Sequence, residues 1–181
     1  MKTTALLLPS LALLLGASTC LCQAPAASPP PPPVVVADFK AEPANAPGGG
    51  AWLRLLAPFR SSPSWADGIV FYYDVLVQKG DQYRVLSGTA RYSNVKAGSH
   101  SAVLYMSPSA VARFGAPVAA QVGVGYKDEL IESFKWNAPG SKAPEGWSTQ
   151  YERYSDQLMP IYLTPFVATE YGKYPDIMVS R

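Results

Sequence analysis

Apolar and polar side chains alternate along most of the chain between residues 34 and 137, a period-two pattern that is typical of β-strands. The pattern is clearest from Ile69 to Gln78, where every second residue is Ile, Phe, Tyr or Val. A short turn at Lys79–Gln82 leads into Tyr83 to Tyr92. We therefore expect these two segments to pair as antiparallel neighbours.

Five further segments show strand character, separated by turns rich in glycine, proline and serine. They are Val34 to Glu42, Ala51 to Phe59, Ser101 to Met106, Val118 to Tyr126 and Leu130 to Trp136. We expect a loop at Ser61–Ser64 and a turn at Lys96–Ser99. Ser107 and Pro108 favour the start of a short helix, which Gly115 would end.

About seven strands at this spacing predict an all-β fold. The simplest architecture is an immunoglobulin-like β-sandwich over residues 34–137 with one short connector helix, and a small barrel is the alternative. The antibody-type core cysteines are absent, and Phe71 and Tyr73 stand on the third strand where antibody domains have tryptophan. The prediction therefore depends on the number and periodicity of the strands.

Residues 1–22 have the layout of a secretory signal peptide, with one lysine, an apolar run from Ala5 to Leu15 and small residues after it. The run is too short for a membrane helix, so we expect no transmembrane segment in the mature chain. Cleavage would follow Thr19 or Cys22, and lipidation of Cys20 is a third alternative. Both cysteines lie in or beside this signal, so hydrophobic burial alone must hold the mature domain together.

Two proline-rich segments flank the predicted sandwich. Residues 23–33 predict an extended polyproline spacer. Residues 138–181 form a C-terminal tail that is rich in both proline and aromatic residues. Because disordered chains are poor in aromatic side chains, we expect the tail to pack on the sandwich or on a neighbouring subunit. Its segment from Tyr162 to Phe166 would dock into an apolar groove.

Charge and motifs point to no cofactor. Lys and Arg number 15 against 13 Asp and Glu, so we expect no binding to nucleic acid. His100 is the only histidine, and a histidine alone in a turn is most simply a solvated residue. We therefore expect no metal site and no catalytic residues. A small glycosidase using Asp74 or Glu132 is an alternative, although an outward-facing Asp74 and an edge or interface position for Glu132 are the simpler interpretations.

Aromatic side chains offer another chemistry, because exported proteins often hold sugars against aromatic faces. Trp65 and Trp147 lie in predicted loops, where they could stack on a ligand. Together with Tyr162, Leu163 and Phe166 of the tail, they are the candidate residues for binding a partner or ligand. A carbohydrate-binding module for host glycans is therefore an alternative function.

The segments SPSAVARFG at Ser107–Gly115 and MPIYLTPF at Met159–Phe166, followed by Tyr171 and Tyr174, resemble a known group. They are similar to small exported immunoglobulin-like proteins associated with the type IV pilus, or fimbrial, apparatus of Akkermansia-type Verrucomicrobia. The resemblance implies a structural or adhesive role without enzymatic activity, in the periplasm, in the outer membrane or on the cell surface of a Gram-negative-type bacterium. The implied partners are other envelope or pilus-associated proteins, or further copies of the chain as a homo-oligomer.

One difference separates this chain from the pilins themselves. A pilin keeps its apolar amino-terminal helix, which carries a glutamate near its start. Here the apolar segment contains no glutamate and leads directly into prolines. We therefore expect the protein to accompany a pilus system and not to polymerise as a pilin.

Overall fold

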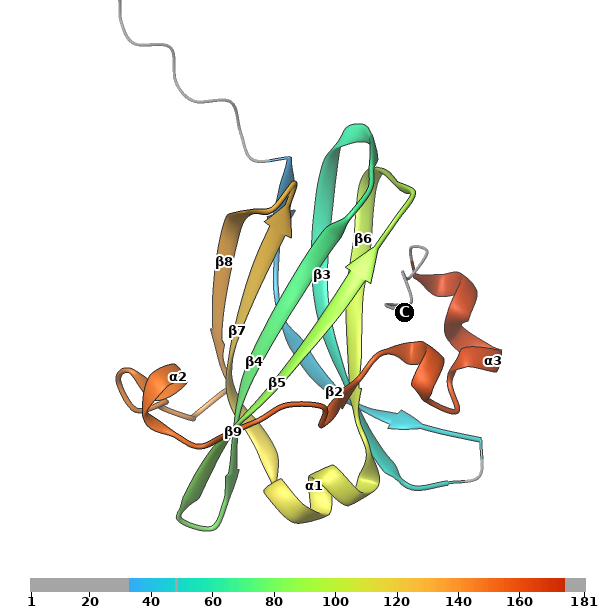
Figure 1. Cartoon of the computed structure of the whole chain (residues 1–181). Coiled ribbons are helices and arrows are strands. Elements are labelled where there is room, and N and C mark those ends of the chain that lie inside the picture. Colours follow the sequence, from blue (N-terminus) through green and yellow to red (C-terminus); the bar gives the residue numbers. More distant parts are fainter. Residues whose placement is uncertain (1–32, 48, 175–181) are drawn as a thin grey trace, which may run out of the picture. The chain divides into compact units, whose positions relative to one another are not determined.

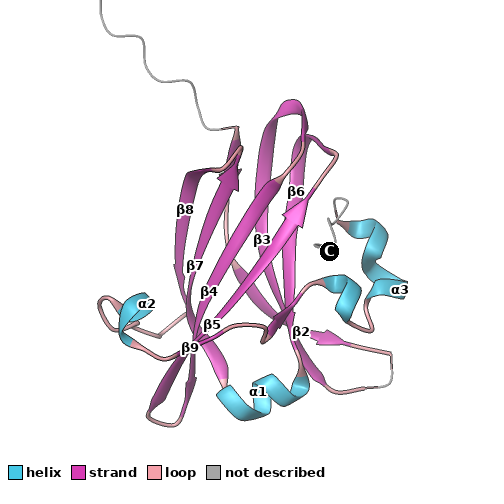
Figure 2. Ribbon diagram, in the orientation of Figure 1, coloured by secondary structure: helices cyan, strands magenta, loops and turns pink. Residues whose placement is uncertain are grey.

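Two five-stranded β-sheets face each other and enclose a shared hydrophobic core (Figure 1 and Figure 2). The structure is a computed structural model that describes residues 33–47 and 49–174. The expected signal peptide, nearly all of the proline-rich spacer and the last residues of the tail lie outside the described residues. None of the helices formed by the described residues is long and apolar enough to cross a membrane.

The strands are divided between the sheets in the immunoglobulin-like manner. The first sheet contains, in order, β1 (Val34–Val36), β3 (Ala51–Ala66), β6 (Val95–Met106) and β10 (Leu158–Met159), and β2 (Lys40–Asn45) also pairs with β3. The second sheet contains, in order, β8 (Glu129–Asn137), β7 (Ala116–Tyr126), β4 (Ile69–Lys79), β5 (Gln82–Tyr92) and β9 (Arg153–Tyr154). The chain enters the second sheet at β4, returns to the first with β6 and re-enters the second with β7. This confirms the predicted all-β sandwich.

Two strand boundaries near the amino-terminal end differ from those expected. The segment from Val34 to Glu42 forms two strands, β1 and β2, because the chain leaves the sheet between them and buries Phe39 in the core. The expected loop at Ser61–Ser64 belongs to β3, which continues to Ala66 beyond a register shift against β6. Extra residues on one strand at such a shift bend the strand locally without ending it.

The turn expected at Lys96–Ser99 lies instead around Asn94, whose φ is 52°. Lys96–Ser99 belongs to β6, where Gly98 and Ser99 pair with Ser61 and Arg60 of β3. His100 is therefore a strand residue opposite Phe59, and not a turn residue as expected. Hydrogen bonding to a neighbouring strand has overridden the local preference of glycine and serine for turns.

The alternation along β4 supplies the centre of the core. Ile69, Phe71, Tyr73, Val75 and Val77 all point inward and are buried. Partners from both sheets enclose them, such as Phe59, whose ring centroid lies 4.8 Å from that of Phe71. Since no disulfide crosses the described core, this burial of apolar area is the main stabilising term.

The connector helix begins and ends as the sequence predicts. Helix α1 (Pro108–Phe114) begins after Ser107, whose Oγ accepts a hydrogen bond of 3.1 Å from the amide of Ala110. It ends at Gly115, which has a φ of 90°. A Cβ at this position would collide with the backbone carbonyl of Gln78, so glycine is required there.

The residues after Asn137 fold back over the sandwich (Figure 1). Helix α2 (Trp147–Gln150) lies on the outer face of the second sheet, and β9 then pairs with β5. β10 next pairs with β6 at the edge of the first sheet. The chain continues through η1 (Ile161–Leu163), α3 (Val167–Glu170) and η2 (Tyr171–Lys173). The tail thus shields strand edges of both sheets, which reduces edge-to-edge association.

Phe166 anchors the end of the tail on the outer face of the first sheet. Its ring stacks on Tyr105 at a centroid distance of 4.7 Å and meets Trp52 edge-on at 5.6 Å. Only 2% of Phe166 is exposed, whereas Leu163 is 62% exposed. Within the segment expected to dock, Phe166 is therefore enclosed by its own chain and Leu163 points outward.

A charged cluster holds the chain immediately after Phe166. Arg54 on β3 donates to Glu170 at 2.9 Å, and the hydroxyl of Tyr105 donates to the same carboxylate at 2.7 Å. Burial alone would raise the pKa of Glu170, but the hydrogen bonds from Tyr105 and Arg54 and the charge of Arg54 outweigh it and lower the pKa. The folded state therefore favours the ionised form of Glu170.

Replacing Phe166 with alanine is expected to destabilise the folded protein by about 3 to 5 kcal/mol, because it removes a large enclosed ring from its contacts with Tyr105 and Trp52. Urea unfolding measures this loss. Leu163→Ala is the matched control in the same segment and should change stability by no more than about 0.5 kcal/mol, since Leu163 is exposed. Equal effects of the two substitutions would contradict docking of Phe166 on its own sandwich.

The contribution of Glu170 to stability is expected to depend on pH. Its pKa is lowered in the folded state, so the stabilisation is fully present above the unfolded-state value of about 4.5 and is lost as the pH falls through the folded-state pKa. Unfolding free energies of the native protein and Glu170→Gln should therefore differ at pH 7 and converge in acid. A difference that is constant from pH 7 to pH 3 would rule out this role.

Candidate functional site

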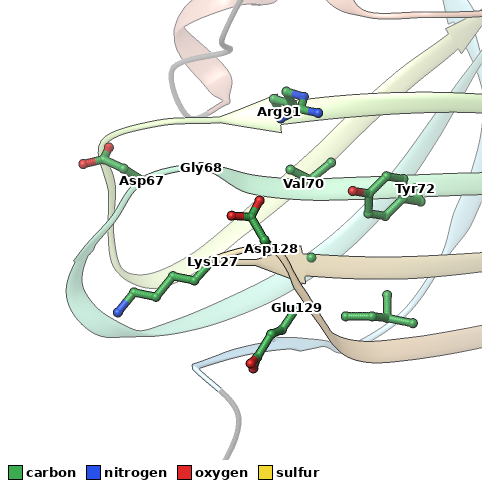
Figure 3. A pocket seen from close by; sticks show the side chains of 10 residues that line it. Asp67, Gly68, Val70, Tyr72, Arg91, Lys127, Asp128 and Glu129 are labelled. Carbon is green, nitrogen blue, oxygen red and sulfur yellow. The ribbon is translucent and has the colours of Figure 1, made fainter.

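A hollow of about 540 Å³ lies on the outer face of the second sheet, at the end where β4 begins and β7 turns into β8 (Figure 3). Val70, Tyr72 and Leu130 form its apolar floor, and Arg91, Asp128 and Glu129 are charged residues at its rim. We call this the Tyr72 hollow. The opposite end of the same outer face is covered by Trp147 and its neighbours from the tail, whereas this end is open.

The hollow follows from strand alternation and from glycines on the neighbouring strand. The side chains of Val70 and Tyr72 point away from the core because their neighbours on β4 point inward. Across the ladder, β7 places Gly125 opposite Val70 and Gly123 opposite Tyr72. Neither glycine carries a side chain to fill the outer face, so the sheet surface is depressed at these positions.

The ring of Tyr72 occupies this depression. A Cβ placed on Gly125 would lie 3.1 Å from Cε2 of Tyr72, and one placed on Gly123 would lie 3.9 Å from Cδ2. The ring edge thus runs along both glycines, and Figure 3 shows the ring turned broadside to the viewer. Tyr72 remains 47% exposed and Leu130 beside it 69% exposed, which leaves an apolar platform open to solvent.

The turn between β7 and β8 forms part of the rim. Its central residues, Lys127 and Asp128, have φ values of 52° and 63°, the left-handed conformation of a two-residue hairpin turn. Glycine or asparagine is preferred there, and another residue such as lysine costs roughly 1 to 2 kcal/mol. The turn carries the charged side chains of Lys127 and Asp128 beside the hollow. The Lys127 ammonium lies 5.2 Å from the ring centroid of Tyr126.

Several polar groups at the rim are available to a ligand. Arg91 comes from β5, directly across the ladder from Val70, whereas Asp128 and Glu129 come from the β7–β8 turn. Within the part of the chain that the structure describes, none of these three side chains forms an ion pair or hydrogen bond. Asp67 differs, because it accepts a hydrogen bond of 2.7 Å from the amide of Asn94.

The Tyr72 hollow therefore combines a flat aromatic surface with hydrogen-bond donors and acceptors. Such a mixture suits binding and orientation of a ligand. Among the described residues, no group of three or more His, Cys, Asp or Glu side chains is arranged to hold a metal ion.

Neither candidate tryptophan lies in a loop, as the sequence predicted for both. Trp65 is a strand residue of β3 and not a loop residue; it is 56% exposed, but the ammonium of Lys96 lies 5.1 Å from its ring centroid. Trp147 belongs to α2 and is half-buried against the outer face of the second sheet. It also lines a smaller hollow of about 260 Å³ together with Trp136.

The tail candidates do not form one surface. Tyr162 and Leu163 line a hollow of about 330 Å³ beside β5, whereas Phe166 is enclosed by Tyr105 and Trp52. The side chain of Phe166 is therefore not accessible to an external ligand in this arrangement.

The carboxylates considered for glycoside hydrolysis lie on opposite faces of the second sheet. Asp74 faces outward and accepts hydrogen bonds from Ser87 at 2.8 Å and from Arg153 at 2.7 Å. Glu132 shares the inward-facing side of β8 with Phe134, and burial raises its pKa. The two groups thus cannot flank one glycosidic bond as a catalytic pair does.

Glu132 has a structural explanation at the edge of the second sheet. β8 is the outermost strand on that side, and an inward-pointing charge on an edge strand opposes pairing with another chain.

His100 contacts residues of its own and the neighbouring strand. Its Nε2 lies 2.7 Å from the carbonyl oxygen of Lys96, and its ring centroid lies 5.5 Å from that of Phe59.

Tyr72, Arg91 and Leu130 were not among the site residues predicted from the sequence. A usable signal was present, because β4 carries apolar and aromatic residues on its outward side while β7 carries Gly123 and Gly125 on alternate positions. The pairing register was needed to show that these glycines lie beside Tyr72.

The described domain is thus an immunoglobulin-like β-sandwich with an open, aromatic-floored hollow on one sheet. A family model named for an Akkermansia protein matches residues 51–181, which is more than half of the chain. The chain belongs to this family, in agreement with the resemblance noted at Ser107–Gly115 and Met159–Phe166. None of the curated proteins matches the chain.

Proposed function

We propose that this protein is an exported, non-enzymatic binding and structural component of the bacterial envelope or surface, associated with a type IV pilus system. Family membership supports this role, because the match spans both the sandwich from β3 onward and the tail that folds back on it. The observation that carries the binding part is the Tyr72 hollow, where an open aromatic floor adjoins three charged groups without partners among the described residues.

The arrangement of the edges supports a component that contacts its partners selectively. The tail pairs with β5 and β6, and β8 carries the inward-pointing Glu132. Strand addition between copies at these edges is therefore disfavoured. Partners would bind through side-chain surfaces and loops, which suits an accessory protein better than a polymerising subunit.

A hydrolytic role is less consistent with the site. Asp74 is held by Ser87 and Arg153, and Glu132 points to the other side of the sheet. The residues around the Tyr72 hollow supply contacts for binding but no nucleophile activated by a neighbouring base.

The pilus association can be tested by shearing surface appendages from cells that express a tagged form of the protein. The protein should co-fractionate with pilus components and crosslink to them, and a strain that lacks only the pilus assembly machinery should lose this co-fractionation. Recovery of the protein in one soluble pool, unchanged in the assembly-deficient strain, would contradict the proposal.

A further inference from the structure

We propose that the Tyr72 hollow binds a neutral saccharide, with one sugar ring stacked on Tyr72 and its hydroxyl groups hydrogen bonded to Arg91 and Asp128. The inference rests on the proposed role as a non-enzymatic binding protein and names its ligand class. It also moves the carbohydrate-binding surface away from Trp65 and Trp147, which the sequence alone favoured.

The placement of Tyr72 suits stacking with a sugar. One edge of its ring lies against the sheet at Gly123 and Gly125, while nearly half of the residue stays exposed. An aromatic face is electron-rich and attracts the weakly positive C–H groups that line one side of a pyranose ring. Leu130, beside the same ring, extends this apolar contact.

The rim supplies the polar half of the recognition. A sugar hydroxyl both donates and accepts hydrogen bonds, so it needs acceptors and donors side by side. Arg91 is a donor, and Asp128 and Glu129 are acceptors; none has a partner among the described residues. These three groups line the hollow together with the apolar floor.

The balance of charge favours a neutral ligand. Arg91 and Lys127 are opposed by Asp67, Asp128 and Glu129, so the lining carries both signs with a small acidic excess. A strongly anionic ligand would face three carboxylates, and a cation would face two basic groups. The volume of about 540 Å³ lies within the roughly 300 to 1,000 Å³ typical of small-molecule sites.

A peptide strand fits this surface less well. The floor lies on β4 and β7, which are inner strands of the second sheet and are hydrogen bonded on both sides. No free strand edge is therefore offered at the floor for β-strand addition, the usual way in which sheets bind extended peptides.

NMR titration of the ¹⁵N-labelled protein tests the inference, using galactose, glucose, mannose, N-acetylglucosamine and the disaccharide lactose as probes and glucuronic acid as the charged comparison. At least one neutral probe is expected to shift the amide signals of Gly123, Gly125 and Leu130 in a saturable manner. Tyr72→Ala should weaken this binding by about tenfold or more, and Tyr72→Phe should retain it.

Three further variants test whether binding depends on the Tyr72 hollow and not on the two tryptophans. Gly125→Ala keeps the tyrosine but places a methyl group 3.1 Å from its ring, so it should displace the ring and also weaken binding. Trp65→Ala and Trp147→Ala should bind as the native protein does. Absence of saturable shifts with every neutral probe would overturn the inference, as would binding that depends on Trp65 or Trp147 and not on Tyr72.

The same samples distinguish this inference from the proposed function. Lactose that binds at Tyr72 and stays intact supports both proposals. Lactose that binds there and is cleaved would overturn the non-enzymatic role and leave the saccharide site standing. Failure of saccharide binding by the purified protein would leave co-fractionation with pili unaffected.

Discussion

The alternation of side chains along β4 is the constraint on which both the core and the site depend. Its odd-numbered residues from Ile69 to Val77 fill the space between the sheets, which places Val70 and Tyr72 on the outer surface. A register slip by one residue would turn the inward-facing residues outward and the outward-facing residues inward, so both the core and the Tyr72 hollow would be lost. Because burial without a described disulfide holds the sandwich together, this register is strongly fixed, and Tyr72 is fixed with it.

The tail completes the domain and determines which surface remains open. Trp147 and its neighbours cover one end of the outer face of the second sheet, and Phe166 with Glu170 covers part of the outer face of the first. The end of the second sheet that carries Gly123 and Gly125 keeps an aromatic floor exposed. The packing of the tail therefore determines which part of the outer face of the second sheet is open to a ligand.

Features set by local sequence were predictable, and features set by pairing between distant segments were not. The β4–β5 hairpin and the Ser107 cap of α1 follow from residues close together in the chain, and both are present. The strand character of Lys96–Ser99 comes from pairing with β3, which local preference cannot reveal. The site depends in the same way on the β4–β7 register. Without that register, the sequence favoured Trp65 and Trp147 as ligand-binding residues, and not Tyr72.

The chemical shifts of the outward α-protons of Gly123 and Gly125 test the central claim most directly. An aromatic ring deshields protons that lie beside its edge, and the edge of the Tyr72 ring runs along these glycines. We expect both resonances to lie downfield in the native protein and to return toward ordinary values in Tyr72→Ala, while Trp65→Ala leaves them unchanged. Ordinary shifts in the native protein that do not respond to Tyr72→Ala would contradict the position of the Tyr72 ring beside Gly123 and Gly125.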